Sequence, residues 1–143
     1  MTPINTILEN FSVLDDWEDR YRYVIELGNE LEPLTEAEHS PHYKVHGCAS
    51  QVWLVSERQP GSADGPRLHF RGDSDAHIVR GLIAILMATF SGKTANEILS
   101  LEAQPLFAQI GLKDHLTQQR SNGLASMIQR IRADAAAALQ PPA

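Results

Sequence analysis

The spacing of apolar residues predicts two amphipathic helices at the start of the chain. Pro3 suits the first turn of a short helix. Asp15 and Asp16 then offer an N-cap for a second helix that ends near Gly28, and its apolar positions recur at helical spacing (Tyr21, Val24, Ile25 and Leu27). Residues 29–42 show no clear period, so we expect an irregular connection there.

A β-hairpin is predicted in the middle of the chain. From Gln51 onward β-branched and aromatic residues dominate, in the run Val52-Trp53-Leu54-Val55. Residues 60–66 carry a turn signal of proline, glycine and aspartate, and residues 67–72 then alternate with period two. A further strand is expected near Tyr43–His46, which makes a small antiparallel sheet of about three strands.

The second half of the chain is predicted to be helical. Apolar residues from Ile78 to Met87 cover nearly the whole circumference of a helix that ends near Gly92, as in a central, buried helix. Thr94 has the spacing of a capping box before a short helix, another begins near Pro105, and a long one starts at about Thr117, before a Pro-Pro tail expected to be disordered. This order predicts an α+β fold, a single domain over residues 1–143 with its sheet covered by helices.

Composition indicates an ordinary globular protein, since 43% of residues are hydrophobic, enough for a sizeable core. The formal charge is −6, and the acidic excess lies in residues 9–38, which argues against nucleic acid as a ligand and leaves a basic protein partner open. The first residues lack the pattern of a signal peptide, and the apolar stretch Gly81–Phe90 is too short for a bilayer. We therefore expect no membrane association, a cytoplasmic location and a reduced thiol.

Cys48 is the single cysteine of the chain. It cannot form an internal disulfide or supply a cysteine-rich metal site, which leaves a structural residue, a nucleophile that meets a partner molecule, or one ligand of a mixed site. Free cysteines are usually buried and inert. The small neighbours Gly47 and Ala49 favour a loop tip instead, and His46 can stabilise a thiolate if the backbone is extended.

Other motifs give weaker signals. Residues 91–94 resemble the end of a phosphate-binding loop, but Met87 stands where that motif needs glycine, so nucleotide binding is rejected. The cluster of His39, His42, His46 and Cys48 has metal-ligand residue types without the spacing of a zinc finger, and we expect no metal and no cofactor. A cysteine hydrolase, with His69, His77 or His115 as base, stays open as a remote alternative.

Four separated motifs resemble the SufE family of sulfur-acceptor proteins. They are residues 17–28, Gly47–Leu54, residues 72–82 and residues 115–124, and together they cover nearly the whole chain in order. One departure is Ala49, where the family commonly has glutamine. The resemblance implies a SufE-like fold.

The resemblance also implies a function. Cys48 takes sulfur as a persulfide from a cysteine desulfurase, a pyridoxal-phosphate enzyme that it activates, and passes the sulfur to a scaffold for iron–sulfur cluster assembly. The protein is then an accessory without turnover of its own, and a homodimer is left open. The alternative is a carrier for a related desulfurase that feeds tRNA modification or another thiolation. An idle thiol would be tucked against apolar neighbours such as Trp53 or Leu54.

Three polar residues are further candidates for the site. Asp73 and Asp75 directly precede a predicted helix, and capping of that helix is the simplest interpretation of both. Arg120 lies near a helix start, where a cation opposes the helix dipole, so we expect it to face the cysteine loop or the desulfurase.

Overall fold

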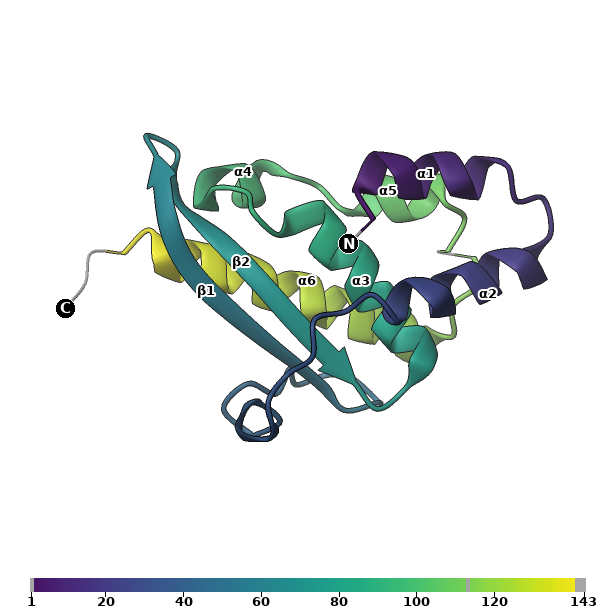
Figure 1. Ribbon diagram of the computed structural model, residues 1–143, viewed down its shortest axis with the longest axis horizontal. Coiled ribbons are helices and arrows are strands. Elements are labelled where there is room, and N and C mark those ends of the chain that lie inside the picture. Colours follow the sequence, from purple (N-terminus) through teal and green to yellow (C-terminus); the bar gives the residue numbers. More distant parts are fainter. Residues whose placement is uncertain (1, 113, 141–143) are drawn as a thin grey trace.

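The computed structural model describes residues 2–112 and 114–140 (Figure 1). The first two helices are α1 (Ile4–Ser12) and α2 (Trp17–Gly28). Pro3 is the N-cap residue of α1, and the Asp16 carboxylate accepts a hydrogen bond from the Glu18 backbone N–H at the start of α2. Both predicted helices are confirmed.

The sheet is one antiparallel hairpin of β1 (Val52–Ser62) and β2 (Gly65–Ser74). Its strands run further than predicted, so the turn shrinks to Ala63 and Asp64. Pro60 is tolerated because it lies where the register shifts, between Gln59 and Ser62.

The third strand predicted near Tyr43–His46 is reduced to a single bridge. Lys44 pairs with Trp53, flanked by backbone hydrogen bonds from Val45 N–H to Val52 O (2.8 Å) and from Leu54 N–H to Tyr43 O (2.9 Å). The chain turns away at Gly47, which has a φ of 91°. This left-handed conformation ends the pairing, so the expectation of about three strands is corrected to two strands and a bridge.

Helix α3 (His77–Phe90) is the central helix, as predicted, and almost all of its residues are buried. It packs against α2 at very short range, because a Cβ atom on Gly81 would collide with the Val24 carbonyl. On its other side α3 lies against β2, where Ile83 contacts the backbone of Gly72. The helix is therefore surrounded by other elements, which explains its apolar circumference.

The remaining helices are α4 (Ala95–Ser100), α5 (Gln104–Gln109) and α6 (Gln118–Ala138). The predicted capping box of α4 is present: the Thr94 hydroxyl accepts from Glu97 N–H, and the Glu97 carboxylate accepts from Thr94 N–H. The Thr117 hydroxyl caps α6 by accepting a hydrogen bond from Arg120 N–H. The Pro-Pro tail lies outside the described residues.

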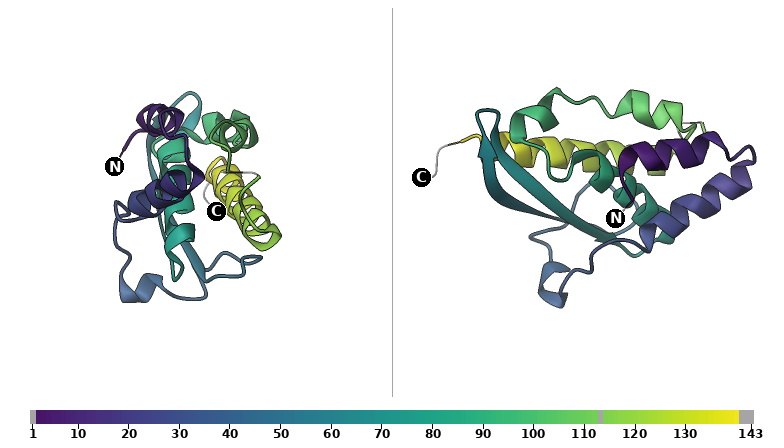
Figure 2. Two further views of the ribbon diagram at one scale, coloured as in Figure 1. Left: turned by 90° about the vertical axis from the view of Figure 1, so that its right-hand side faces the viewer. Right: turned by 45° about the horizontal axis from the view of Figure 1, so that its top comes forward.

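The two faces of the hairpin are covered differently (Figures 1 and 2). Helices α3 and α6 pack on one face, against Leu54, Leu68 and Phe70. The opposite face carries the strap, which we define as residues 32–45 and which includes the short 3₁₀ helix η1 (Glu36–Glu38). Within the described ranges, no helix combines the length and apolarity needed to cross a membrane.

Candidate functional site

Cys48 lies in the loop that joins the strap to β1. The hydrogen bond between Val45 and Val52 closes this loop, residues 46–51, at its base. Gly47 turns the backbone just before the cysteine, and a Cβ atom there would lie 2.5 Å from the Ser126 hydroxyl oxygen. The predicted sharp turn at Gly47 is confirmed, and its glycine is required both by φ and by the approach of α6.

The thiol of Cys48 points into a small pocket and is only partly exposed. Its Sγ–H donates to the Gly123 carbonyl oxygen at 3.5 Å. The cavity measures about 20 Å³, with apolar walls from β1, α3 and α6 (Val52, Val79, Leu82 and Met127) and a polar rim from the first turn of α6 (Gln119 and Arg120). The thiol therefore rests between two helices at the end of the sheet.

Burial raises the pKa of the Cys48 thiol above its ordinary value. In this position the sulfur is a neutral thiol near neutral pH, which is the unreactive form. His46 is exposed and does not line the pocket, so the thiolate stabilisation expected from it is not seen in this conformation. A nucleophilic sulfur requires the side chain to leave the pocket or a cation to approach it.

One face of α6 supports the loop along its length. The Gly123 carbonyl accepts from the Cys48 thiol, and Ser126 lies against Gly47. One turn further on, the Arg130 guanidinium donates to the Lys44 carbonyl at 3.4 Å. These α6 residues are three and four positions apart, so they share one face of the helix. A Cβ atom on Gly123 would meet Cys48 Sγ at 3.5 Å, an ordinary van der Waals contact, so α6 packs closely against the cysteine here.

The interpretation of Asp73 and Asp75 as helix caps is wrong. The N-cap residue of α3 is Ala76, which receives no side-chain cap. The Asp75 carboxylate instead accepts from Gln51 N–H at 3.0 Å, while Asp75 N–H donates to the Gln51 carbonyl at 3.3 Å. Asp75 thus fastens the end of the Cys48 loop to the start of α3.

Asp73 lies on the other face of the hairpin and points to the strap. Its carboxylate binds the His39 ring at 2.8 Å and lies 3.1 Å from the Arg80 guanidinium. It accepts from Ser74 N–H as well. Asp73 is therefore part of a strap contact and does not touch the thiol pocket.

Arg120 is among the residues that line the Cys48 pocket, and its role toward the desulfurase stays a prediction. The proposed walls were wrong: Leu54 belongs to the core and Trp53 faces the strap, and Val52 takes their place. Val79, Leu82 and Met127 were missed as site residues because their helical spacing is equally typical of core positions.

The group of His39, His42, His46 and Cys48 does not gather around one point. His39 binds Asp73, His42 packs on the Tyr43 ring, and Cys48 enters its own pocket. In the part of the chain that the structure describes, no three histidine, cysteine or carboxylate side chains are placed to hold a metal ion.

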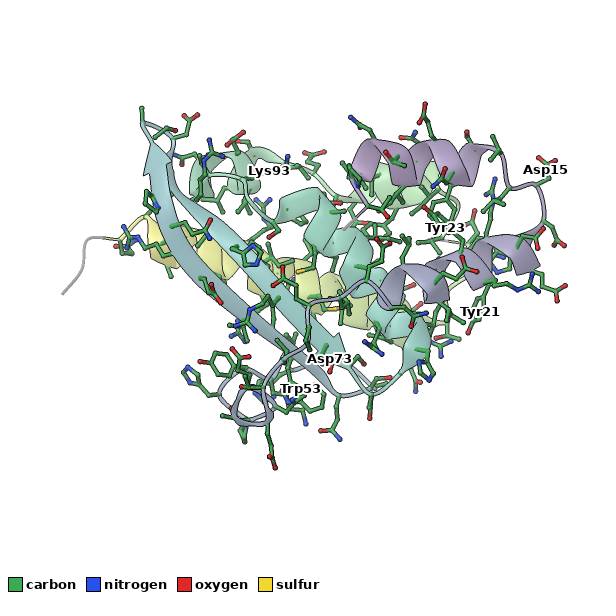
Figure 3. All side chains as sticks on the ribbon, in the orientation of Figure 1. Asp15, Tyr21, Tyr23, Trp53, Asp73 and Lys93 are labelled. Carbon is green, nitrogen blue, oxygen red and sulfur yellow. The ribbon has the colours of Figure 1, made fainter. Side chains whose placement is uncertain are left out.

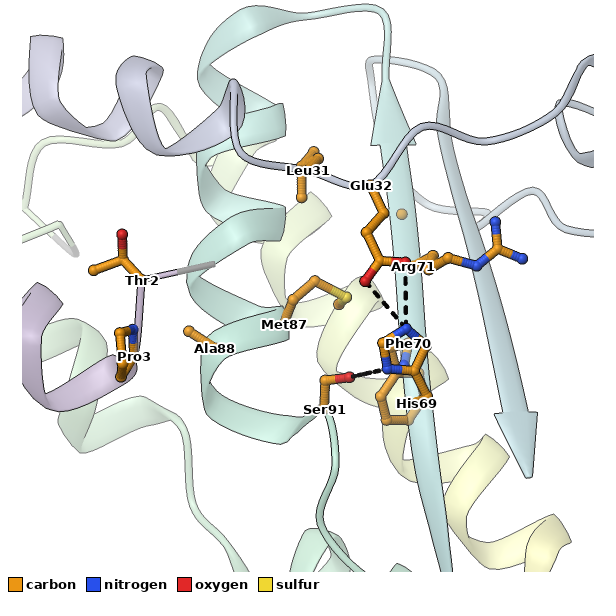
Figure 4. Close-up of a pocket in the computed structure, with 11 residues that line it drawn as sticks. Thr2, Pro3, Leu31, Glu32, His69, Phe70, Arg71, Met87, Ala88 and Ser91 are labelled. Atoms are coloured by element: carbon orange, nitrogen blue, oxygen red, sulfur yellow. Dashed lines mark hydrogen bonds and ion pairs between the residues drawn. The ribbon is translucent and has the colours of Figure 1, made fainter. Parts of the chain in front are cut away.

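A larger cavity, of about 230 Å³, lies between the N-terminal residues, β2 and α3 (Figure 4). Here the Ser91 hydroxyl lies 3.3 Å from His69 Nδ1, and His69 Nε2 lies 3.3 Å from the Glu32 carboxylate. The order resembles a hydrolase relay, but the Ser91 oxygen already accepts from Phe70 N–H, and the N–H groups of Ser91 and Gly92 donate to backbone carbonyls. With these two donors occupied, the backbone N–H groups of Ser91 and Gly92 do not form an oxyanion hole.

The histidines that could act as the base of a cysteine hydrolase do not lie beside Cys48. His69 is bound in the larger cavity, and His115 stacks on the Trp17 ring at 3.8 Å. His77, the first residue of α3, is exposed and does not line the Cys48 pocket. Among the described residues that line the Cys48 pocket there is no histidine. Cys48 therefore has no general base of this kind, which disfavours that alternative.

Comparison with known proteins identifies the family. The family model SufE, an Fe-S metabolism associated domain, matches residues 5–135, with Cys48 and its pocket inside the match. The chain belongs to the SufE family. An uncharacterized SufE-like protein of Rhizobium etli is 56% identical over 135 residues (94% of this chain and 90% of the relative), and one of Rhizobium meliloti is 55% identical (94% and 96%).

A solved structure shares the fold of this SufE-family chain. It is the solution structure of a hypothetical protein from Thermus thermophilus, with a TM-score of 0.74, 21% identity, and coverage of 97% of this chain and 98% of that one. The likeness supports the α+β architecture alone. Family membership connects the chain with iron–sulfur metabolism.

Proposed function

We propose that Cys48 accepts sulfur from a pyridoxal-phosphate cysteine desulfurase, as a persulfide, and passes it on for iron–sulfur cluster assembly. The main support for the proposal is where the single cysteine, Cys48, lies in the structure. It lies in a loop hinged at Gly47, with its thiol in a pocket of atomic size, in a chain of the SufE family. The protein acts as an accessory that activates the desulfurase, and its reduced thiol suits the cytoplasm.

The reaction is a thiol exchange that needs no oxidant or reductant. The Cys48 thiolate attacks the outer sulfur of the desulfurase persulfide, and a new S–S bond forms at Cys48. The S–S bond within the desulfurase persulfide breaks, and its cysteine leaves as a thiolate that takes up the proton lost by Cys48. One thiol on each protein suffices, which fits a chain with a single cysteine.

The pocket suits a carrier between its two encounters. A volume of about 20 Å³ is room for roughly one water-sized group, comparable to one added sulfur atom. The apolar walls keep this sulfur from solvent reductants. The loop must move for transfer, because burial raises the pKa of the thiol and the pocket leaves the sulfur only partly exposed to a partner.

Mass spectrometry after incubation with a cysteine desulfurase and cysteine tests the proposal. We expect the mass of one sulfur atom on the peptide that contains Cys48 and faster desulfurase turnover. Cys48→Ser should fold with a stability change of about 1 kcal/mol or less and lose both effects, because a hydroxyl is not ionised at neutral pH. Sulfur-dependent activation by a folded Cys48→Ser protein would refute the proposal.

A further inference from the structure

Three polar pairs hold the strap on the outer face of β2. They are Glu32 with His69 (3.3 Å), Glu38 with Arg71 (2.6 Å) and His39 with Asp73 (2.8 Å). The β2 members are two positions apart, so their side chains share one face of the strand. The strap therefore follows the strand, fastened at successive positions.

His39 has acceptors on both sides of its ring. Its Nδ1 lies 2.8 Å from the Thr35 carbonyl oxygen, and its Nε2 lies 2.8 Å from an Asp73 carboxylate oxygen. A neutral imidazole carries one N–H and can donate to one of these oxygens, whereas an imidazolium donates to both. Loss of the proton leaves a nitrogen lone pair against an oxygen at hydrogen-bonding distance. The geometry of this contact is that of a protonated histidine.

The surroundings of His39 favour its charge. The groups that face it are the Asp73 carboxylate, the Thr35 carbonyl, Glu38 from η1, the Trp53 ring of β1 at 4.8 Å, and Arg80 of α3 across Asp73. The hydrogen bond to Asp73 raises the pKa of His39, partial burial opposes this, and the Thr35 carbonyl adds to the increase. Arg80 remains a cationic partner for Asp73 when His39 is neutral.

The His39 contact is coupled to both ends of the Cys48 loop. Asp73 is directly opposite Trp53 in the hairpin (Figure 3). Trp53 also bridges to Lys44, which precedes the loop. Two residues beyond Asp73, the Asp75 carboxylate holds Gln51 at the end of the loop. Release of the strap therefore weakens the support on which the loop rests.

We propose that His39 is a proton-controlled latch: its protonated ring holds the strap and the resting Cys48 loop in place, and its deprotonation loosens both. The consequence for sulfur transfer rests on the function proposed above, but the latch is a property of the free protein. Because the folded-state pKa is raised above 6.5, the latch is fully present below pH 6.5 and is lost as pH rises through the folded pKa.

Two measurements on the free protein test the latch. NMR titration of the His39 ring should give a pKa above 6.5. The amides of Val45 and Leu54, which bond the strap to β1, should lose about threefold or more of their protection between about pH 6 and pH 8.5, after correction for intrinsic exchange. His39→Gln should show the lower protection at both pH values. His42→Gln, an exposed histidine of the same strap, should behave as wild type.

The latch is refuted if His39 titrates at or below 6.5, if wild-type protection does not change with pH, or if His42→Gln reproduces the effect of His39→Gln. Sulfur transfer is measured in parallel. If a persulfide forms on Cys48 but the protection of the Val45 and Leu54 amides does not depend on pH, the latch is refuted and the proposed function stands. Protection that depends on pH, without persulfide on Cys48, overturns the proposed function and leaves the latch in place.

Discussion

At the scale of single residues, burial and reactivity make opposite demands on Cys48. The pocket protects the sulfur but raises the pKa of the thiol, so protection lasts only while the loop is folded back. Gly47 permits this position because it combines a φ of 91° with close contact to Ser126. The resting state of the thiol therefore depends on a residue without a side chain.

Gly47→Ala should displace the loop and increase the rate at which iodoacetamide alkylates Cys48. Its Cβ would lie 2.5 Å from the Ser126 hydroxyl, in addition to the cost of about 1–2 kcal/mol for a left-handed non-glycine residue. Gly92→Ala is the matched control, because Gly92 also has a positive φ (84°) and its Cβ would meet no atom within 4 Å. It should cost similar stability and leave alkylation unchanged. Equal alkylation in the two variants would contradict this account.

At the scale of secondary-structure elements, the Cys48 loop is held at separate points by β1, by the connection between β2 and α3, and by α6. The Val45–Val52 bond closes its base, Asp75 holds its end, and α6 contacts Gly47 and Cys48 in its middle. The contacts at the base and end involve backbone groups of the loop, whereas the thiol is held by one long hydrogen bond. The middle of the loop is therefore the part that opens at least cost.

Asp75→Ala should loosen the end of the loop. Loss of the bond to Gln51 N–H removes about 0.5–1.5 kcal/mol locally, so the Gln51 amide should exchange faster by up to about tenfold. Helix α3 should keep its stability, because Asp75 does not cap it. Hydrogen exchange of residues 51 and 78–90 measures both effects, with Asp64→Ala at the hairpin turn as control. Fraying of α3 in Asp75→Ala would restore the capping interpretation.

At the scale of the whole molecule, the hairpin is held between helices and strap by different forces. Apolar side chains pack on the inner face, and charged pairs hold the outer face. Arg71 is central to the second group, since it binds both Glu38 and Glu57. Its hydrogen bonds lower the pKa of Glu38 to about 2.

The global stability of the protein should therefore fall at acid pH, as the Glu38 carboxylate becomes protonated. A lowered carboxyl pKa stabilises the fold above the unfolded value of 4.5, and this contribution disappears as pH falls through about 2. Glu38→Gln should unfold at lower urea concentration than wild type near pH 7, and the difference should shrink steadily below pH 4.5. Glu36→Gln, the exposed neighbour in η1, should show no such trend. A constant difference at every pH would assign the effect of Glu38→Gln to packing.

Most of the local structure of this protein could be predicted from the residue pattern alone. Helical spacing and helix caps depend on residues only a few positions apart, so both can be predicted directly from the sequence. Examples are the apolar spacing around Val24 and Leu82, the cap at Asp16 and the capping box at Thr94. The same holds for the turn at Gly47, where glycine marks a special backbone conformation. Because Cys48 is the single cysteine, any thiol chemistry of the protein must take place at its sulfur atom.

The surroundings of the Cys48 sulfur depend on tertiary contacts. Val79 and Met127 reach the pocket from helices that lie far from Cys48 in sequence, and Asp75 binds the loop across 24 residues. The third strand was overpredicted because local pattern does not show that Gly47 turns the chain away after one bridge. Such contacts depend on how α3 and α6 pack on the hairpin, since side chains at one spacing can serve equally as core or as pocket wall.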